Sequence, residues 1–159
     1  METLVKARGR VLAVTPEATI SEAAKIMRDH AVGAIVVVDG DEVVGILSER
    51  DIIARVVAAD GDPASTAVGQ AMTRRVISCA PGTSMERVKK LMHEHGIRHL
   101  PIVENGKAVG MISSRDVLAH ELSVARAVMH RQNRILSDLE RSYPGIARIK
   151  ITPDGRVVI

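Results

Sequence analysis

Two short motifs combine the residue types that bind a small polar ligand. Residues 45–51 (GILSERD) and residues 110–116 (GMISSRD) carry Gly, Ser, Arg and Asp at the same places. In each motif an apolar run typical of a strand ends at the serine, and an apolar stretch typical of a helix follows the aspartate. A helix N-terminus presents backbone N–H groups that favour phosphate, and a carboxylate can accept hydrogen bonds from a diol. The motifs therefore predict sites for a small ligand with phosphate and hydroxyl groups.

The motifs belong to a longer internal repeat. Shifted by 65 positions without a gap, residues 10–53 align with residues 75–118. Pro16 meets Pro81, several other residues are identical, and apolar positions mostly meet apolar positions. A match that passes through every turn without a gap indicates one supersecondary unit used twice.

Each unit is expected to follow the order β-α-β-β-α, which places the chain in the α+β class. In the first unit Thr19 is a candidate helix N-cap, and Glu22 three residues later completes a capping box. The other expected elements of that unit are strands over 11–14, 35–38 and 42–47 and a helix over 48–59. The second unit repeats them, with strands over 76–79, 100–103 and 108–112 and helices from Ser84 and Ser114.

The whole chain divides into four segments. Residues 1–60 form the first repeat, 61–74 a linker, 75–120 the second repeat and 121–159 a C-terminal extension. The extension should contain a helix that stops at Ser142 and then a β-hairpin, because 146–151 alternates and 153–155 is a turn signal. Seven residues of this helix recur at a 4-3-4-3 spacing, which is typical of a coiled-coil seam or of an amphipathic helix packed on its own domain. They are Leu118, Leu122, Ala125, Met129, Gln132, Leu136 and Leu139.

Composition narrows the function classes. At 46% hydrophobic residues the chain can bury a core, yet no apolar run approaches the roughly 20 residues of a membrane helix. The single Cys79 aligns with Val14, so it is expected in the core, and it fits a reducing, cytoplasmic compartment. A net charge of only +3 and a single aromatic residue, Tyr143, argue against a nucleic-acid binder.

The sequence offers no arrangement of catalytic or metal-binding residues. No Ser-His-Asp order, phosphate-binding Walker loop or metal-hydrolase motif appears, so we expect a protein that is not an enzyme. His93, His95 and His99 do not share a continuous helical face, and no carboxylate or thiol cluster accompanies them. They are therefore expected to face solvent or phosphate rather than a metal ion.

The tandem repeat with its Gly-apolar-apolar-Ser-x-x-Asp motif resembles a pair of CBS domains, also called a Bateman module. Residues 97–103 (IRHLPIV), residues 71–73 (AMT) and the Thr-Pro and Ala-Pro steps at 15–16 and 80–81 are further features of that family. The resemblance covers roughly residues 1–120 and does not extend to the C-terminal helix and hairpin. It implies two repeats packed as a pseudo-symmetric pair.

The resemblance also implies an adenosine nucleotide, such as AMP, ADP or ATP, in clefts between the repeats. Asp51 and Asp116 would then bind ribose hydroxyls, while the serines, arginines and the histidine of the set would approach phosphate. Backbone near the first and second strands of each repeat would contact the base. The implied ligand-binding residues are Thr15, Ser48, Arg50, Asp51, Ala80, Arg98, His99, Pro101, Ser113, Arg115 and Asp116. In the first repeat Gly33 and Ala34 replace Arg98 and His99, so we expect two unequal clefts.

Two functions follow as hypotheses. The first is a non-catalytic regulatory module with no obligatory cofactor, which forms a homodimer and transmits nucleotide occupancy to the dimer or to a protein partner through residues 121–159. The alternative is a ligand-free structural or interaction protein that assembles through the repeats and the extension. In that case Asp51 and Asp116 would serve only as acidic caps in the first turn of a helix.

Overall fold

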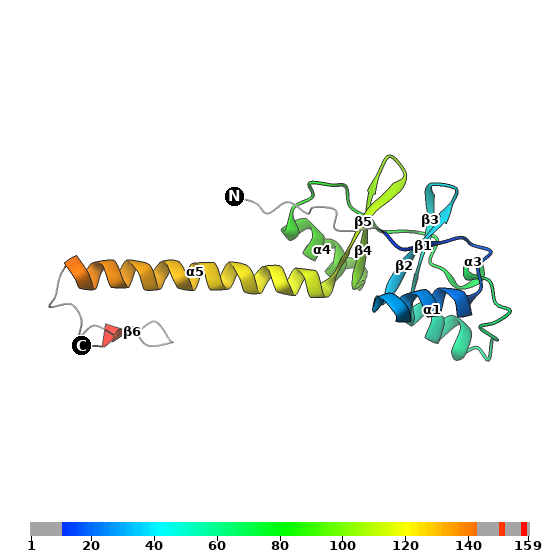
Figure 1. The fold of residues 1–159 in the computed structure, drawn as a ribbon, viewed down its shortest axis with the longest axis horizontal. Coiled ribbons are helices and arrows are strands. Elements are labelled where there is room, and N and C mark those ends of the chain that lie inside the picture. The colour runs from blue at the N-terminus through cyan, green and yellow to red at the C-terminus, as the bar shows by residue number, and fades with distance from the viewer. Residues whose placement is uncertain (1–10, 143–149, 152–156, 159) are drawn as a thin grey trace. The chain divides into compact units, whose positions relative to one another are not determined.

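The computed structural model describes residues 11–142, 150–151 and 157–158 (Figure 1). The chain divides into two compact units, Met1–Val117 and Leu118–Ile159. The first unit holds both repeats and the second holds the extension. The α+β class and the tandem β-α-β-β-α pattern are confirmed, with one strand reduced as described below.

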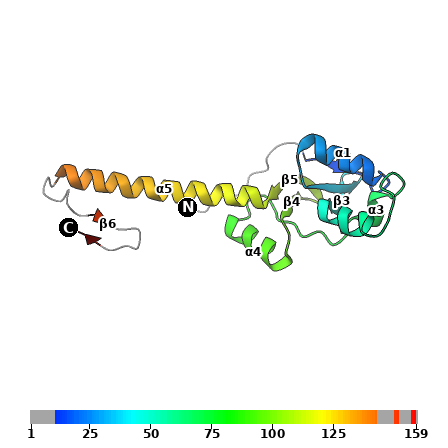
Figure 2. The same cartoon turned by 90° about the horizontal axis from the view of Figure 1, so that it is seen from below.

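The first repeat builds a three-stranded sheet with one helix along its face (Figure 2). Strand β1 (Ala13–Val14) runs parallel to β2 (Ala34–Asp39), and β2 pairs antiparallel with β3 (Glu42–Ser48). Helix α1 (Ile20–His30) begins with the expected capping box, since the Thr19 amide donates to Glu22 Oε2 over 2.8 Å and the Glu22 amide donates to Thr19 Oγ1 over 3.2 Å.

Apolar side chains from every element of the first repeat form one core. Short helices follow β3: α2 (Glu49–Ile52), the π-helical turn η1 (Ile53–Val57) and, within the linker over 61–74, α3 (Val68–Ala71). The fully buried members of the core come from α1, the strands, η1 and α3, and they include Ile20, Ala23, Ile35, Val37, Leu47, Val56 and Val68. The second repeat has its own core, which includes Cys79, Val88, Leu100 and Ile102. The core position expected for Cys79 is thus confirmed.

The second repeat contains α4 (Met85–His95), β4 (His99–Glu104) and β5 (Lys107–Ser113). The Arg87 amide donates to the Ser84 hydroxyl, which confirms Ser84 as the N-cap of α4. Strands β4 and β5 are joined by Asn105 and Gly106, and both of these residues have positive φ.

The strand expected over 76–79 is wrong, because only a single bridge between Cys79 and Ile102 forms there. In the first repeat the Val36 amide donates to the Leu12 carbonyl and extends the parallel ladder. Pro101 aligns with Val36 and has no N–H group, so the corresponding hydrogen bond to Ile77 cannot form.

The two repeats contact each other through their hairpins, which lie side by side in Figure 1. The Val43 amide donates to the Gly106 carbonyl over 3.0 Å, and Lys107 Nζ lies 2.5 Å from Asp41 Oδ2. Because this ion pair is exposed, it contributes little to stability.

One helix, α5 (Ser114–Ser142), begins at the second motif and continues as the helix of the extension. The expected hairpin is confirmed by β6 (Lys150–Ile151) pairing antiparallel with β7 (Val157–Val158); its turn over 153–155 lies outside the described residues. Within the described ranges, no helix combines the length and the hydropathy of a membrane span.

Candidate functional site

Both motifs begin their helices with the same pair of side chains. The Ser48 amide and hydroxyl donate to Asp51 Oδ2 over 2.8 and 2.6 Å, and the Asp51 amide donates to the Ser48 hydroxyl over 3.3 Å. Ser113 and Asp116 repeat these contacts at 2.8, 2.6 and 3.4 Å. One oxygen of each aspartate therefore caps a helix, which is a structural task that needs no ligand.

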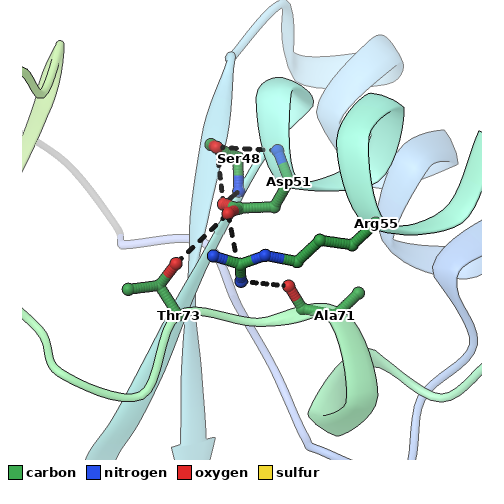
Figure 3. Close-up of polar contacts among 5 residues, drawn as sticks. All are labelled: Ser48, Asp51, Arg55, Ala71 and Thr73. Atoms are coloured by element: carbon green, nitrogen blue, oxygen red, sulfur yellow. Dashed lines mark hydrogen bonds and ion pairs between the residues drawn. The ribbon is translucent and has the colours of Figure 1, made fainter. Parts of the chain in front are cut away.

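The other carboxylate oxygen distinguishes the two aspartates. Asp51 Oδ1 accepts from the Thr73 hydroxyl over 3.1 Å and lies 3.2 Å from Arg55 Nη1 (Figure 3). Arg55 also donates to the Ala71 carbonyl over 2.7 Å. In contrast, Asp116 Oδ1 accepts no hydrogen bond from any described residue. Both oxygens of Asp51 are thus satisfied by its own chain, whereas the second oxygen of Asp116 has no hydrogen-bond donor among the described residues.

Close backbone packing brings Thr73 to Asp51. The Ile46 amide donates to the Thr73 carbonyl over 3.0 Å, and the Thr73 amide donates to the Ile46 carbonyl over 2.8 Å. This pairing needs Gly45, because a Cβ atom there would lie 2.5 Å from the sulfur of Met72. Neither Arg55 nor Thr73 belongs to the residues expected from the sequence. One signal was available: Arg55 lies four residues after Asp51, the spacing of a helical ion pair.

The helix starts offer fewer free N–H groups than the motif suggests. The Glu49 amide donates to the Gly33 carbonyl over 3.0 Å, and the Ser114 amide donates to the Arg98 carbonyl over 2.9 Å. The amides of Asp51 and Asp116 are already used by the serines. An anion at these helix starts would therefore be bound mainly by side chains.

Cavity 1 has a volume of about 250 Å³ and contains the first motif. Its walls combine residues 48–51 and Thr73 with Arg75, Ile77 and residues 95–99 of the second repeat. Three arginines, at positions 50, 75 and 98, line this cavity together with the carboxylates of Glu49 and Asp51. Its aspartate, however, is already paired with Arg55 and Thr73.

Cavity 2 has a volume of about 360 Å³ and contains the second motif. Residues 113–116 and Met111 face residues 11–12 and 31–34 of the first repeat, together with Glu49, Arg98 and His99. The volume falls in the range of about 300–1,000 Å³ that is typical of small-molecule sites. Each cavity therefore joins the motif of one repeat to strand ends of the other.

Arg98 and His99 line both cavities, so this pair alone does not distinguish the two clefts. Their shared position depends on Gly33, where a Cβ atom would lie 3.0 Å from His99 Cε1 and 3.2 Å from Glu49 Oε2. The inequality between the clefts lies instead in the carboxylates of Asp51 and Asp116.

Burial lowers the pKa of His99 below its ordinary value of 6.5. The positive charges of Arg98 and Arg115 act in the same direction, while Glu49 and Asp116 oppose them. The imidazole is therefore neutral at neutral pH. An anion bound beside it would favour protonation, because an opposite charge stabilises the charged form.

The structure places eight of the eleven expected site residues in the cavities and leaves three outside. Ser48, Arg50 and Asp51 line cavity 1, Ser113, Arg115 and Asp116 line cavity 2, and Arg98 and His99 line both. Thr15 and Ala80 are exposed and Pro101 is buried in β4, and none of the three lines either cavity. In the described part of the chain, no three potential metal ligands cluster.

Comparison with known proteins agrees with this arrangement. The CBS domain model matches residues 5–58 and residues 68–123. The chain belongs to the CBS-domain family. The CBS domain-containing protein YhcV of Bacillus subtilis is 39% identical over 114 residues, which span 72% of this chain and 81% of YhcV.

Solved structures of CBS pairs share the fold. A putative signal-transduction protein with CBS domains from Burkholderia ambifaria is 35% identical with a TM-score of 0.69, over 72% of this chain and 84% of that chain. The CBS pair of protein MJ0100, solved with 5′-methylthioadenosine and S-adenosylmethionine, is 27% identical with a TM-score of 0.71, over 77% of this chain and 98% of that chain. CBS pairs are regulatory modules that often bind adenosine-containing ligands, and stand-alone CBS proteins are generally not catalytic.

Proposed function

We propose that this CBS pair binds one adenosine-type nucleotide, such as AMP, ADP or ATP, in cavity 2 and transmits its occupancy to a homodimer or a protein partner. The observation that carries the proposal is the uncommitted Oδ1 of Asp116, a residue that lines a cavity of about 360 Å³ together with Arg98 and Arg115. The family relationship and the adenosine ligands of the MJ0100 pair support the ligand class.

The chemistry of cavity 2 matches the parts of such a nucleotide. Ribose hydroxyls would donate to Asp116, and phosphate would accept charge-assisted hydrogen bonds from Arg98 and Arg115. The base would lie between aliphatic side chains, since the cavity wall holds Leu12 and Val32 and no aromatic residue. Recognition of the base would then come from backbone groups of residues 31–34.

Cavity 1 is the weaker site in this proposal. A ribose there would have to displace Thr73 and Arg55 from Asp51, whose side chain is only 12% exposed. The smaller volume of cavity 1, about 250 Å³, also disfavours nucleotide binding there. We therefore expect one strong nucleotide site per chain.

A thermal-shift screen tests the ligand class. AMP, ADP or ATP at about 100 times its dissociation constant should stabilise the protein by roughly 2.7 kcal/mol, which raises the melting temperature visibly. GMP and inorganic phosphate serve as controls for the base and for the anion alone. If no adenosine compound raises the melting temperature above these controls, the proposal fails.

The second candidate, a ligand-free structural module, is favoured by the two capping pairs, because Asp51 and Asp116 already serve their helices. In that case Asp116→Ala should lower stability by about 1 kcal/mol, the usual effect of losing a cap, and Asp51→Ala should lower it further because it also removes the contacts with Arg55 and Thr73. Neither substitution would then alter any response to a nucleotide.

A further inference from the structure

Large apolar side chains are exposed along α5. Of the eight large hydrophobic residues that are exposed within the described residues, six belong to this helix, and the other two lie in η1. They are Leu118, Leu122, Val124, Val128, Met129 and Ile135, each 47–62% exposed. Contiguous exposed apolar surface marks an interaction site in most proteins.

Five of these six residues have the spacing of a helix that packs along another helix, and Val124 lies outside that pattern. Leu122 and Met129 occupy position a of a heptad, Leu118, Ala125 and Gln132 occupy position d, and Val128 and Ile135 occupy the flanking position g. We call the a and d residues Leu118, Leu122, Ala125, Met129 and Gln132 the α5 seam. All five are exposed. Most of the stability of a helix in a protein comes from packing of its apolar face, so the seam needs a partner.

We propose that the partner is a second copy of this chain, paired parallel and in register along the α5 seam. Gln132 decides between the two orientations. In a parallel pair each d residue meets its own copy, so the two Gln132 amides can hydrogen-bond to each other. In an antiparallel pair d residues face a residues, and Gln132 would be buried against an apolar side chain such as Leu122 or Met129. A buried amide without a partner is destabilising.

The flanking charges favour the same orientation. A parallel pair brings position g of one helix to position e of the next heptad on the other helix. This places Glu121 opposite Arg126 of the second copy, and the symmetry of the pair repeats the contact. In an antiparallel pair g faces g, and no described g residue of α5 is basic.

Pairing along α5 stands apart from nucleotide binding, because no residue of the seam lines either cavity. One proposal can therefore fail without the other. The matched control position is Ala127, which is exposed at position f on the opposite side of the helix.

Cysteine cross-linking tests the pairing and its orientation together. In the full chain with Cys79→Ala, Gln132→Cys should form a covalent dimer under mild oxidation, whereas Ala127→Cys should remain monomeric on a non-reducing gel. Adding Met129→Glu to Gln132→Cys should abolish the covalent dimer, and adding Ala127→Glu should leave it unchanged. Circular dichroism of each variant establishes that it is folded.

Three outcomes would overturn the proposal. Folded Gln132→Cys protein that stays monomeric would show that the seam is covered in another way, for example by the hairpin of its own chain or by an antiparallel copy. Equal cross-linking at Ala127 would show that contact is not specific to the seam. Cross-linking that persists with Met129→Glu would show that the apolar seam does not hold the helices together.

Discussion

Asp51 and Asp116 occupy the same place in two copies of one motif, and both cap a helix through one carboxylate oxygen. The two residues differ in the contacts of their second carboxylate oxygen, Oδ1. In Asp51 this oxygen contacts Arg55 and Thr73. In the second repeat, His120 stands where Arg55 stands in the first. In our proposal this difference makes the first motif a structural element and leaves the second available to a ligand.

Removing the partner of Asp51 should destabilise the protein. Arg55→Met leaves a carboxylate that is only 12% exposed without its cation, and it also removes the donor to the Ala71 carbonyl. We expect the free energy of unfolding to fall by about 1–2 kcal/mol in urea titrations. Arg50→Met is the matched control, because Arg50 forms no ion pair with any described residue. Equal losses in both variants would contradict the role given to Arg55.

His99 should make stability depend on pH. Its pKa is lower in the folded protein than the ordinary 6.5, so the unfolded chain binds the proton more readily. The stability contributed by His99 is therefore complete above about pH 6.5 and is lost as pH falls toward the lowered pKa. Between about pH 7.5 and 5.5 the wild type should lose more stability than His99→Gln. Parallel melting curves for the two proteins would show that His99 does not titrate in this way.

At the scale of elements, a single proline accounts for the missing strand of the second repeat. Pro101→Val should restore the amide that Val36 supplies in the first repeat and extend the ladder toward Ile77. Hydrogen exchange should then show a protected amide at position 101. Net stability should change by less than about 1 kcal/mol, because the new hydrogen bond is offset by the greater freedom of the unfolded chain. Rapid exchange at that amide would contradict this explanation.

Most of the fold could be predicted because its signals are local and occur twice. The gap-free repeat, the capping box at Thr19 and the turn at Asn105 and Gly106 are visible in adjacent residues. The helix of the second repeat and that of the extension are one element, and the apolar spacing that begins at Leu118 runs through both parts.

The candidate site could be predicted only in part. The motif residues line the cavities as expected, but the Thr73 hydroxyl reaches Asp51 from 22 residues away in sequence. The position of Arg98 and His99 between both cavities likewise depends on how the two repeats pack. These two contacts are tertiary and have no local signal, whereas the spacing of Asp51 and Arg55, absent at Asp116 and His120, was visible in the sequence.

At the scale of the whole pair of repeats, nucleotide binding should depend on Arg98 and His99, the residues at the start of strand β4 that line both cavities. Arg98 lines both cavities, whereas Arg75 lines only cavity 1. If the strong site is cavity 2, Arg98→Ala should weaken ATP binding by about tenfold or more, equivalent to about 1.4 kcal/mol, and Arg75→Ala should change it little. Titration calorimetry on both variants measures the affinity for ATP. A larger loss of affinity in Arg75→Ala would indicate that ATP binds in cavity 1.

The most direct test of the central claim is a calorimetric titration of AMP, ADP and ATP into the wild type, Asp116→Ala and Asp51→Ala. Both variants lose the same helix cap, and Asp51→Ala also loses the contacts with Arg55 and Thr73, so circular dichroism must first show that both are folded. We predict about one nucleotide bound per chain, affinity lowered about tenfold or more by Asp116→Ala, and affinity nearly unchanged in Asp51→Ala. Equal losses in the two variants, or the larger loss in Asp51→Ala, would contradict the assignment of the site to cavity 2.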